Sequence, residues 1–326
     1  MSILVTGGAG FIGRHTIKLL RASGEEIVAL DDLSTGRRDV TGFDSLVEGD
    51  ISDVSLVRSV LRDRAVTAVL HLAASAHVGD SMARPDAYYR NNVSGTVALL
   101  EAMQAEHVQQ LVFASSCSVY GNSASTAAQE IESVIPMSPY GETKLVAERA
   151  LTWYNLAFGL QWIALRYFNV AGAEDALGED LAGCRRIIPR TVHAAIGGGP
   201  SLRVFGTDFE TEDGSAVRDY VHVSDVANAN LLALRYVAQG KPPAVMNIAA
   251  GVGTSVLRII DEVRQQTGHS VPHQLEAARS GDPGCAIADI SCAREELGWV
   301  PVASGLDDIV SSVLRSAELR ASLPQV

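Results

Sequence analysis

Cysteine is scarce in this sequence of 326 residues, and its four cysteines lack the short spacing of a metal site. Cys117, Cys184, Cys285 and Cys292 are therefore expected to be reduced thiols rather than a disulfide framework. We expect each of the eight histidines to be structural or exposed. The sequence thus predicts no metal site.

Basic residues are outnumbered by acidic ones, and long apolar runs are absent from the sequence. Twenty-six lysines and arginines face 38 acidic residues, and the formal net charge of −12 argues against general binding to nucleic acid or anionic membranes. A local basic pocket for a phosphorylated small molecule remains compatible with that charge. No apolar run reaches membrane-spanning length, and Met1 and Ser2 leave no room for a cleavable signal before the first strand. We expect a cytoplasmic protein with a small-molecule partner.

What the sequence does contain, at residues 3–13, is an apolar run that passes through spaced glycines into an amphipathic segment, ILVTGGAGFIG. This order predicts a strand, a tight turn and a helix. Gly7, Gly10 and Gly13 let the turn close without a Cβ clash and let helix N-terminal N–H groups approach a pyrophosphate. An ordinary glycine-rich loop is the alternative, so the context of the motif matters.

That context is the next apolar run, which ends in Asp31, where an acidic side chain meets the ribose hydroxyls of a dinucleotide. The pattern favours NAD over NADP. Arg37 and Arg38 lie close enough downstream to receive a 2′-phosphate, although an exposed loop would also account for them.

Apolar and amphipathic segments alternate over the first 120 residues. We predict strands at 2–6, 27–31, 66–72 and 110–115, and helices at 12–23, 54–63 and 94–106. This βαβ winding predicts an α/β fold with a Rossmann-type, doubly wound parallel sheet, whose ligands bind beyond the carboxyl ends of the strands. Small or polar residues follow those ends, namely Asp31–Asp32, Asp50–Ile51, Ala73–Ala74–Ser75 and Ser115–Ser116.

A second motif begins at Ser138, which can cap a helix that has Pro139 at its first position. Tyr140 and Lys144 are then one turn apart on the same face. A nearby ammonium lowers the pKa of a tyrosine towards working pH, as a general base requires. The spacing alone also occurs by chance on exposed helices, but here it follows a cofactor turn, a βαβ array and Ser115–Ser116.

With these residues the chain resembles an extended short-chain dehydrogenase/reductase and, within that group, the UDP-glucose (UDP-galactose) 4-epimerases. The resemblance spans nearly the whole length. Its motifs are the glycine turn, YYRNNV at 88–93, SSCSVYG at 115–121, PYG at 139–141, LRYFNVAGA at 165–173 and FGTDFETEDGSAVRDYVHVSD at 205–225. The last is the most specific, because its length and order are hard to meet by accident.

The resemblance implies reversible C4 epimerisation of a UDP-hexose with NAD that stays bound. Ser116, Tyr140 and Lys144 become the catalytic group, with Tyr140 as base for the 4-hydroxyl proton. The NAD contacts, with strand-end and turn residues added, are Gly7, Gly10, Phe11, Ile12, Gly13, Asp31, Asp32, Asp50, Ile51, Leu72, Ala73, Ala74, Asn91, Ser115, Tyr140, Lys144 and Phe168. The UDP-sugar contacts are Ser116, Tyr140, Tyr167, Asn169, Arg186, Phe205, Arg218, Arg279, Asp282 and Ala286.

Guanidinium groups are also what a pyrophosphate calls for in an acidic protein, which supports Arg218 and Arg279, although Arg218 and Asp219 could instead form a local salt bridge. The chain departs from the family pattern at two places. Ala76–His77 replaces a lysine that often contacts the cofactor, a variant that also resembles UDP-pentose 4-epimerases. Arg186 stands where relatives often have Asn or His, which leaves a uronic-acid sugar open.

The resemblance also bears on the sugar that is accepted. Counting from RSGD at 279–282, the position that is tyrosine in enzymes confined to UDP-Glc and UDP-Gal is Ala286. The smaller residue predicts that UDP-GlcNAc and UDP-GalNAc are accepted as well. A packed strand, or a slip of one residue to Cys285 or Ile287, would remove this argument.

Two rival functions stay open. An NDP-sugar 4,6-dehydratase shares the fold, but it needs an acid/base pair where this chain has Cys117 and Ser118. A non-enzymatic NAD-sensing regulator would have little reason to keep Ser116, Tyr140 and Lys144 together.

We divide the chain into an NAD-binding domain at 1–178, to which 217–250 partly returns through pieces such as 217–226, and a smaller mixed α/β UDP-sugar domain at 179–326. The resemblance implies a homodimer through the segments 94–106 and 142–157.

Overall fold

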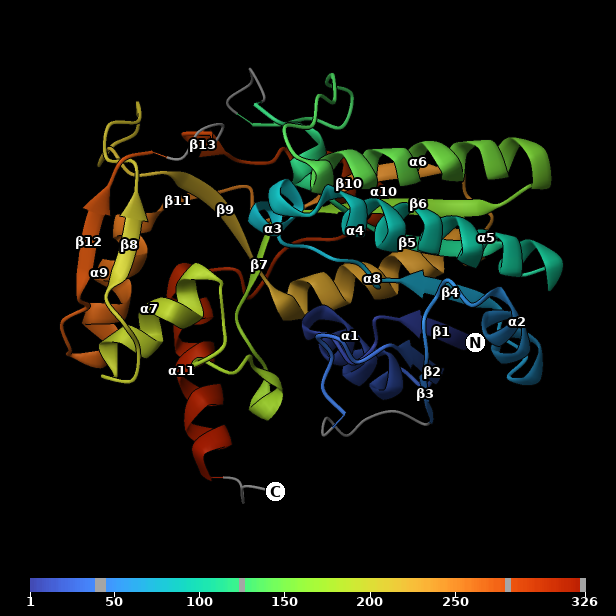
Figure 1. The fold of residues 1–326 in the computed structure, drawn as a ribbon, viewed down its shortest axis with the longest axis horizontal. Helices are drawn as coiled ribbons and strands as arrows, with labels where there is room; N and C mark the ends of the chain where they lie inside the picture. Colours follow the sequence, from blue (N-terminus) through green and yellow to red (C-terminus); the bar gives the residue numbers. More distant parts are fainter. Residues whose placement is uncertain (39–44, 123–126, 279–282, 323–326) are drawn as a thin grey trace.

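The computed structural model describes residues 1–38, 45–122, 127–278 and 283–322. A parallel sheet of seven strands runs through the larger lobe, with the order β10-β6-β5-β4-β1-β2-β3 (Figure 1). Its strands are β1 Ser2–Thr6, β2 Glu26–Asp31, β3 Ser45–Glu48, β4 Ala68–His71, β5 Gln110–Ser116, β6 Gln161–Tyr167 and β10 Ala244–Ile248. The predicted Rossmann-type fold class is confirmed.

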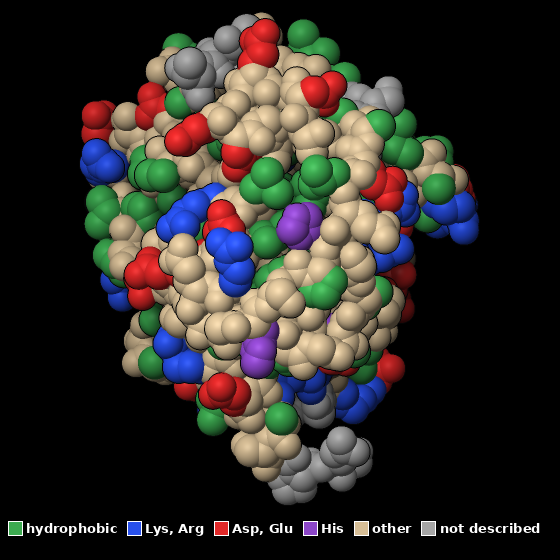
Figure 2. Space-filling model, turned by 90° about the vertical axis from the view of Figure 1, so that its left-hand side faces the viewer, with side chains coloured by type: hydrophobic (Ala, Val, Ile, Leu, Met, Phe, Trp, Pro, Cys, Tyr) green, Lys and Arg blue, Asp and Glu red, His purple; other side chains and the backbone are tan. Residues whose placement is uncertain are grey.

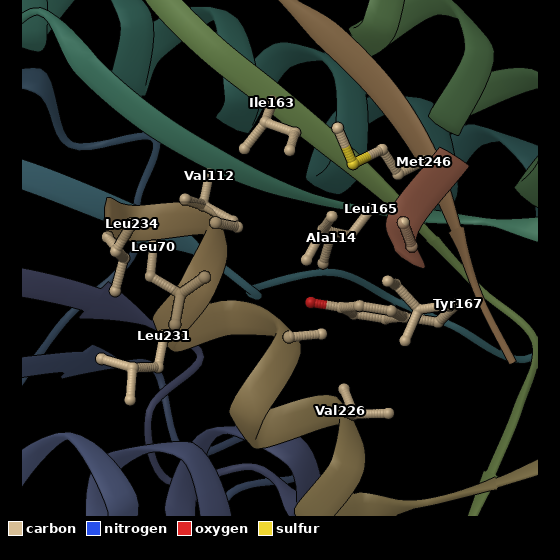
Figure 3. Close-up of a cluster of buried hydrophobic side chains, with 14 of the residues drawn as sticks. Leu70, Val112, Ala114, Ile163, Leu165, Tyr167, Val226, Leu231, Leu234 and Met246 are labelled. Atoms are coloured by element: carbon tan, nitrogen blue, oxygen red, sulfur yellow. The ribbon is translucent and has the colours of Figure 1, made fainter. Parts of the chain in front are cut away.

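Helices cover both faces of this sheet because the strands are apolar on both sides. The helices α1 (Phe11–Ala22) and α8 (Val223–Ala238) close one face, and Figure 3 shows Leu231 and Leu234 of α8 beside strand residues such as Leu70. The other face is closed by α2 Val54–Asp63, α5 Gly95–Ala105 and α6 Pro139–Phe158. The crossing point of the strand order, between β1 and β4, is where such sheets bind ligands.

Short elements connect the strands and helices of this lobe or flank them. They are α3 Val78–Ala83, α4 Pro85–Tyr88, a π-helical turn at Tyr89–Ser94 that leads into α5, a 3₁₀ turn at Cys117–Val119 after β5, a second 3₁₀ turn at Asp175–Leu177, and α10 Ser291–Leu297. The predicted helix 94–106 agrees with α5 to within one residue at each end, and the π-helical turn that precedes it was not predicted.

The second lobe has its own apolar core, built from the helices α7, α9 and α11 against a two-stranded sheet. Its elements are α7 Ile187–Ala195, β8 Leu202–Phe205, α9 Val256–Thr267, β12 His273–Glu276 and α11 Leu306–Ser322. On the face of the molecule seen in Figure 2, basic and acidic side chains are interspersed rather than separated into patches of one sign.

A small sheet joins the two lobes, and here one expectation is wrong. Strand β9 (Val217–His222) does not return to the large sheet but pairs with β7 Asn169–Ala171, β11 Gly253–Ser255 and β13 Cys285–Ala286. The elements that do return are α8 and β10, which follow it. The sequence of 217–222, VRDYVH, carries no information about which sheet takes this strand.

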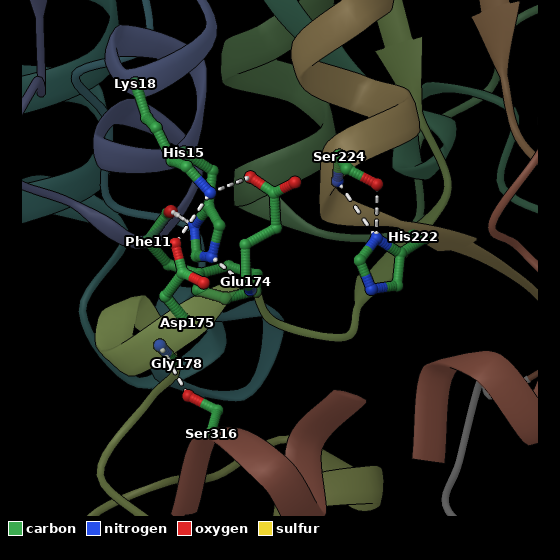
Figure 4. Close-up of polar contacts among 9 residues, drawn as sticks. All are labelled: Phe11, His15, Lys18, Glu174, Asp175, Gly178, His222, Ser224 and Ser316. Carbon is green, nitrogen blue, oxygen red and sulfur yellow. Dashed lines mark hydrogen bonds and ion pairs between the residues drawn. The ribbon is translucent and has the colours of Figure 1, made fainter. Parts of the chain in front are cut away.

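A polar seam ties the first helix to the second lobe (Figure 4). His15 of α1 donates from Nδ1 to the carbonyl oxygen of Phe11 at 2.7 Å, and its Nε2 accepts from the backbone N of Glu174 at 3.2 Å. Ser316 of α11 accepts a bond from the backbone N of Gly178. Burial lowers the pKa of His15 to about 3, so the ring stays neutral and keeps one hydrogen bond on each of its two nitrogens.

Candidate active site

The glycine turn has the backbone that a dinucleotide requires. Gly7 has φ +69°, and a Cβ there would lie 2.7 Å from the backbone N of Ala73. A Cβ on Gly13 would lie 2.3 Å from the carbonyl oxygen of Gly7. Gly10 precedes α1 and, within the described residues, provides no side-chain cap for the first N–H groups of the helix. Such a turn fits the pyrophosphate of NAD.

Asp31 braces this turn from the end of β2. One carboxylate oxygen accepts from the backbone N of Ala9 at 2.9 Å, and the other accepts from that of Leu33 at 2.9 Å. Burial raises the pKa of Asp31, and these N–H groups oppose the rise. Arg38, one of the two possible 2′-phosphate ligands, is paired with Glu48 instead.

A cavity of about 670 Å³ opens beyond the carboxyl ends of the strands and reaches into the small sheet. Its volume lies within the usual range for small-molecule sites. Ten of the predicted site residues line it: Ile12, Ser115, Ser116, Tyr140, Tyr167, Phe168, Asn169, Arg186, Arg218 and Ala286. Residues from both lobes therefore line a single cavity.

Ser116 and Tyr140 meet at this cavity. Ser116 ends β5 and caps the 3₁₀ turn that follows, accepting from the backbone N of Ser118 at 3.2 Å. Ser138 caps α6 by accepting from the backbone N of Gly141, as predicted, which fixes Tyr140 in the first turn. Burial raises the pKa of Tyr140 to about 12, and its hydrogen bond with Ser116 counteracts part of that rise. A base here needs positive charge nearby.

Lys144 is the cation one turn further along α6. Its Nζ donates to the carbonyl oxygen of Ala114 at 2.7 Å and lies 4.9 Å from the ring centroid of Phe113. The side chain is 4% exposed, and this burial lowers the pKa of Lys144 to about 7. The group therefore gains or loses its proton near physiological pH.

The substrate side of the cavity combines β9 and β13. Ala286 pairs with Arg218 in the parallel register of these two strands, so the predicted sugar position and the predicted phosphate ligand are neighbours. Arg186 lies over the ring of Phe11, 4.3 Å from its centroid, and pairs with Glu179 at 3.0 Å. Its guanidinium thus connects the cofactor turn to the second lobe.

Comparison with known proteins identifies the family. Residues 3–249 match the NAD dependent epimerase/dehydratase family. The chain belongs to this family.

Individual relatives agree with this assignment. The chain is 40% identical to the UDP-glucose 4-epimerase of Halalkalibacterium halodurans, over 95% of this chain and 93% of that protein. A crystal structure of UDP-glucose 4-epimerase from Brucella ovis in complex with NAD has a TM-score of 0.94 at 42% identity, over 98% of both chains. The UDP-Glc/GlcNAc 4-epimerase of Campylobacter jejuni has a TM-score of 0.85 at 32% identity, over 97% of this chain and 99% of that one.

In this member of the epimerase/dehydratase family, the remaining predicted site residues are not part of the cavity lining or lie outside the described residues. Residues at the carboxyl ends of the strands, in the glycine turn and near β4 do not line the cavity itself: Gly7, Gly10, Phe11, Gly13, Asp31, Asp32, Asp50, Ile51, Leu72, Ala73, Ala74, Asn91 and Lys144. Phe205 ends β8 in the second lobe and is also absent from the lining. Arg279 and Asp282 lie outside the described residues.

Tyr167 differs from the expectation for a substrate ligand. Its hydroxyl donates to Asn230 of α8 at 2.5 Å, and Figure 3 shows its ring among the core residues between β6 and α8. Tyr167 also lines the cavity. The sequence motif predicts its position but not the direction of the hydroxyl, which depends on a helix 63 residues away.

Two polar networks were not predicted from the sequence. In one, His71 bridges Thr6 and Thr96 at 2.7 and 3.0 Å, and burial lowers its pKa to about 3. In the other, Glu148 binds Ser115 and Arg166. A signal for Glu148 was present, because it lies four residues after Lys144 on α6. Further lining residues that sequence reasoning missed include Tyr120, Met82, Met137 and Tyr220.

The expected absences concern metals, membranes and disulfides. In the described part of the chain, no group of three or more potential ligands could hold a metal ion. A search of the same residues finds no helix that is long and apolar enough to cross a membrane. All four cysteines are free thiols, and burial raises the pKa of Cys117, which lines the cavity, to about 11.

Proposed function

We propose that this protein catalyses the reversible inversion of configuration at C4 of UDP-hexoses, with NAD as a bound cofactor. The observation that carries the proposal is the hydrogen-bonded pair of Ser116 and Tyr140 in a cavity that reaches the cofactor turn through Ile12. Inversion at C4 needs a base for the 4-hydroxyl proton and a cofactor beside the same carbon. NAD, when bound, removes and returns the hydrogen at C4.

The chain's own residues then handle the proton. Tyr140 Oη accepts the proton of the 4-hydroxyl and returns it to the C4 oxygen of the product. Ser116 holds the phenol in place through their hydrogen bond. Burial raises the pKa of Tyr140, and the positive charge of Arg186 lowers it. We propose that the ammonium of Lys144, one helical turn away, lowers it further. Between the two proton transfers, the 4-keto sugar turns within the cavity and presents its other face, which inverts C4. Because the hydrogen that was removed from C4 is returned to it, no net oxidation occurs.

We propose that NAD and the UDP-sugar are bound by two different groups of residues. NAD is held by the turn around Gly7, by Asp31, and by the other predicted cofactor residues at the strand ends. Arg218 binds the pyrophosphate of the UDP-sugar as a guanidinium fork, together with Arg279, which the resemblance alone supports. Asn169 and Ala286 border the sugar.

The rivals have less support. A 4,6-dehydratase needs a carboxylate after Ser116, and the thiol of Cys117, with a pKa raised to about 11, does not replace one. A uronate or pentose 4-epimerase remains the alternative on the substrate side. The Arg186 guanidinium that would meet a sugar carboxylate already has Glu179 as a partner, which favours neutral hexoses.

We propose that N-acetylhexosamines are accepted alongside the hexoses. Ala286 presents a methyl group at the cavity, whereas a phenol ring would overlap an acetamido group. The Campylobacter jejuni relative is described as a UDP-Glc/GlcNAc 4-epimerase, which supports such breadth within the family.

We further propose a cytoplasmic homodimer. Large apolar side chains are exposed on neighbouring helices: Trp153 is 68% and Leu156 69% exposed on α6, and Val97 is 41% exposed on α5. Exposed apolar groups on adjacent helices favour a helix-bundle interface between two copies. The free thiols favour a reducing compartment.

The function is tested by incubating the purified protein separately with UDP-Gal, UDP-GalNAc, UDP-GlcA and UDP-xylose. Each product mixture is then analysed for the C4 epimer. We expect conversion of UDP-Gal to UDP-Glc and of UDP-GalNAc to UDP-GlcNAc. Conversion of UDP-GlcA or UDP-xylose with both hexoses left unchanged would instead establish the uronate or pentose alternative.

A further inference from the structure

A buried ion pair lies directly behind the catalytic lysine. Arg166 of β6 donates two nearly parallel bonds to Glu148 of α6, from Nη2 to Oε2 at 2.7 Å and from Nε to Oε1 at 3.0 Å. The hydroxyl of Ser115 donates to the same Oε1 at 2.5 Å. The side chains of Arg166 and Glu148 are 5% and 7% exposed. Because desolvation cancels much of the attraction within a buried ion pair, a contribution to folding stability does not explain why Glu148 and Arg166 lie beside Lys144.

The carboxylate of Glu148 and the ammonium of Lys144 share one face of α6. They are four residues apart, the spacing at which opposite charges attract across one helical turn. The hydrogen bond that Lys144 donates goes to the uncharged carbonyl of Ala114. Burial lowers the pKa of Lys144, and the negative charge of Glu148 raises it.

The other titratable groups around Lys144 do not supply a negative charge. Burial raises the pKa of Tyr140 on α6 to about 12, and this hydroxyl is an anion only while the ammonium of Lys144 stabilises it, so it does not itself set the charge of Lys144. His71 on β4 is neutral, with a pKa lowered to about 3. Arg166 on β6 is positive and fixed by its bonds to Glu148. In the part of the chain that the structure describes, Glu148 is therefore the anion that acts on Lys144.

We propose that Glu148 is a positioning residue that keeps Lys144 in its ammonium form, with Arg166 and Ser115 holding the carboxylate in place. Glu148 does not line the cavity and touches neither substrate nor cofactor in this account. It acts through Lys144, whose positive charge favours the phenolate of Tyr140. The inference thus deepens the proposed function and rests on it for its catalytic consequence.

The charge on Lys144 can be measured without turnover. The sequence contains three lysines, Lys18, Lys144 and Lys241, so a protein with ¹³C-labelled lysine side chains gives three Cε signals. The variants Lys18→Arg and Lys241→Arg assign them. We expect the titration midpoint of Lys144 to move down by about one pH unit or more in Glu148→Gln, because a nearby opposite charge shifts a pKa by that order.

A matched control is available in the second lobe. Glu262 of α9 is also buried, pairs with Arg258 at 3.2 Å and accepts from Gln266, yet it lies outside the cavity. Glu262→Gln should leave the titration of Lys144 unchanged. Glu148→Asp, which keeps the charge, should bring the midpoint back towards that of the wild type.

Should Glu148→Gln not fold, the double variant Glu148→Gln/Arg166→Met removes both charges and leaves none unpaired. It should show a fall in the Lys144 midpoint that is smaller than in Glu148→Gln, because the loss of the positive charge of Arg166 favours the ammonium. In whichever variant folds, the alkaline limb of kcat/KM for UDP-Gal should move to lower pH by the same amount. A Lys144 midpoint equal to that of Glu262→Gln would overturn the inference even if epimerisation is intact, whereas an inactive wild-type protein would overturn the proposed function instead.

Discussion

Single side chains set the electrostatic state of the cavity. Burial favours the neutral forms of both Tyr140 and Lys144, with pKa values of about 12 and about 7. A phenolate and an ammonium are the forms that proton transfer needs, and each stabilises the other. The chemistry of this site is therefore a property of the pair and of the charges behind it, rather than of either residue alone.

The size of one side chain is expected to decide which sugars are accepted. We predict that Ala286→Tyr lowers kcat/KM for UDP-GalNAc by about tenfold or more while UDP-Gal turnover is largely kept, since overpacking costs about 1–3 kcal/mol. Initial rates with the two substrates measure the ratio. Cys285→Tyr is the register control. If Cys285→Tyr blocks UDP-GalNAc and Ala286→Tyr does not, the gate is Cys285, and the assignment is wrong by one residue.

At the scale of elements, the local patterns predicted what local physics determines. The strands at 2–6 and 110–115 and the helix at 54–63 agree with β1, β5 and α2, because each has a clear apolar periodicity. The cap at Ser138 and the turn at Gly7 were likewise predicted, since both depend on neighbouring residues. The prediction that failed, the sheet that takes β9, depends on distant partners, and so does the hydrogen bond from the Tyr167 hydroxyl to Asn230, for which the sequence made no prediction.

The helices α5 and α6 carry the proposed dimer interface. We predict that Leu156→Glu converts the dimer to a monomer, because it places a charge at the centre of an apolar contact. Static light scattering at micromolar concentration measures the mass. Val302→Glu is the matched control, since Val302 is 80% exposed but lies on neither helix. A wild-type protein that is already monomeric at that concentration would contradict the proposal.

At the scale of the whole molecule, the two lobes contribute different parts of one cavity. The large sheet supplies Ser115 and Ser116 at the end of β5, and the joining sheet supplies Arg218 and Ala286. The sequence predicted most of these residues through the family motifs. It could not predict the Glu148–Arg166 pair as a unit, because that pair forms only when α6 packs against β6.

The most direct test of the central claim follows the hydrogen at C4 through the reaction. UDP-galactose that carries deuterium at C4 is incubated with the wild-type protein and with Tyr140→Phe, and the product is analysed by NMR. We predict that the wild type forms UDP-glucose with the deuterium still at C4, and that Tyr140→Phe is slower by a factor on the order of 10² or more, since the general base is lost. Exchange of the deuterium with solvent, or near wild-type turnover by Tyr140→Phe, would contradict the account.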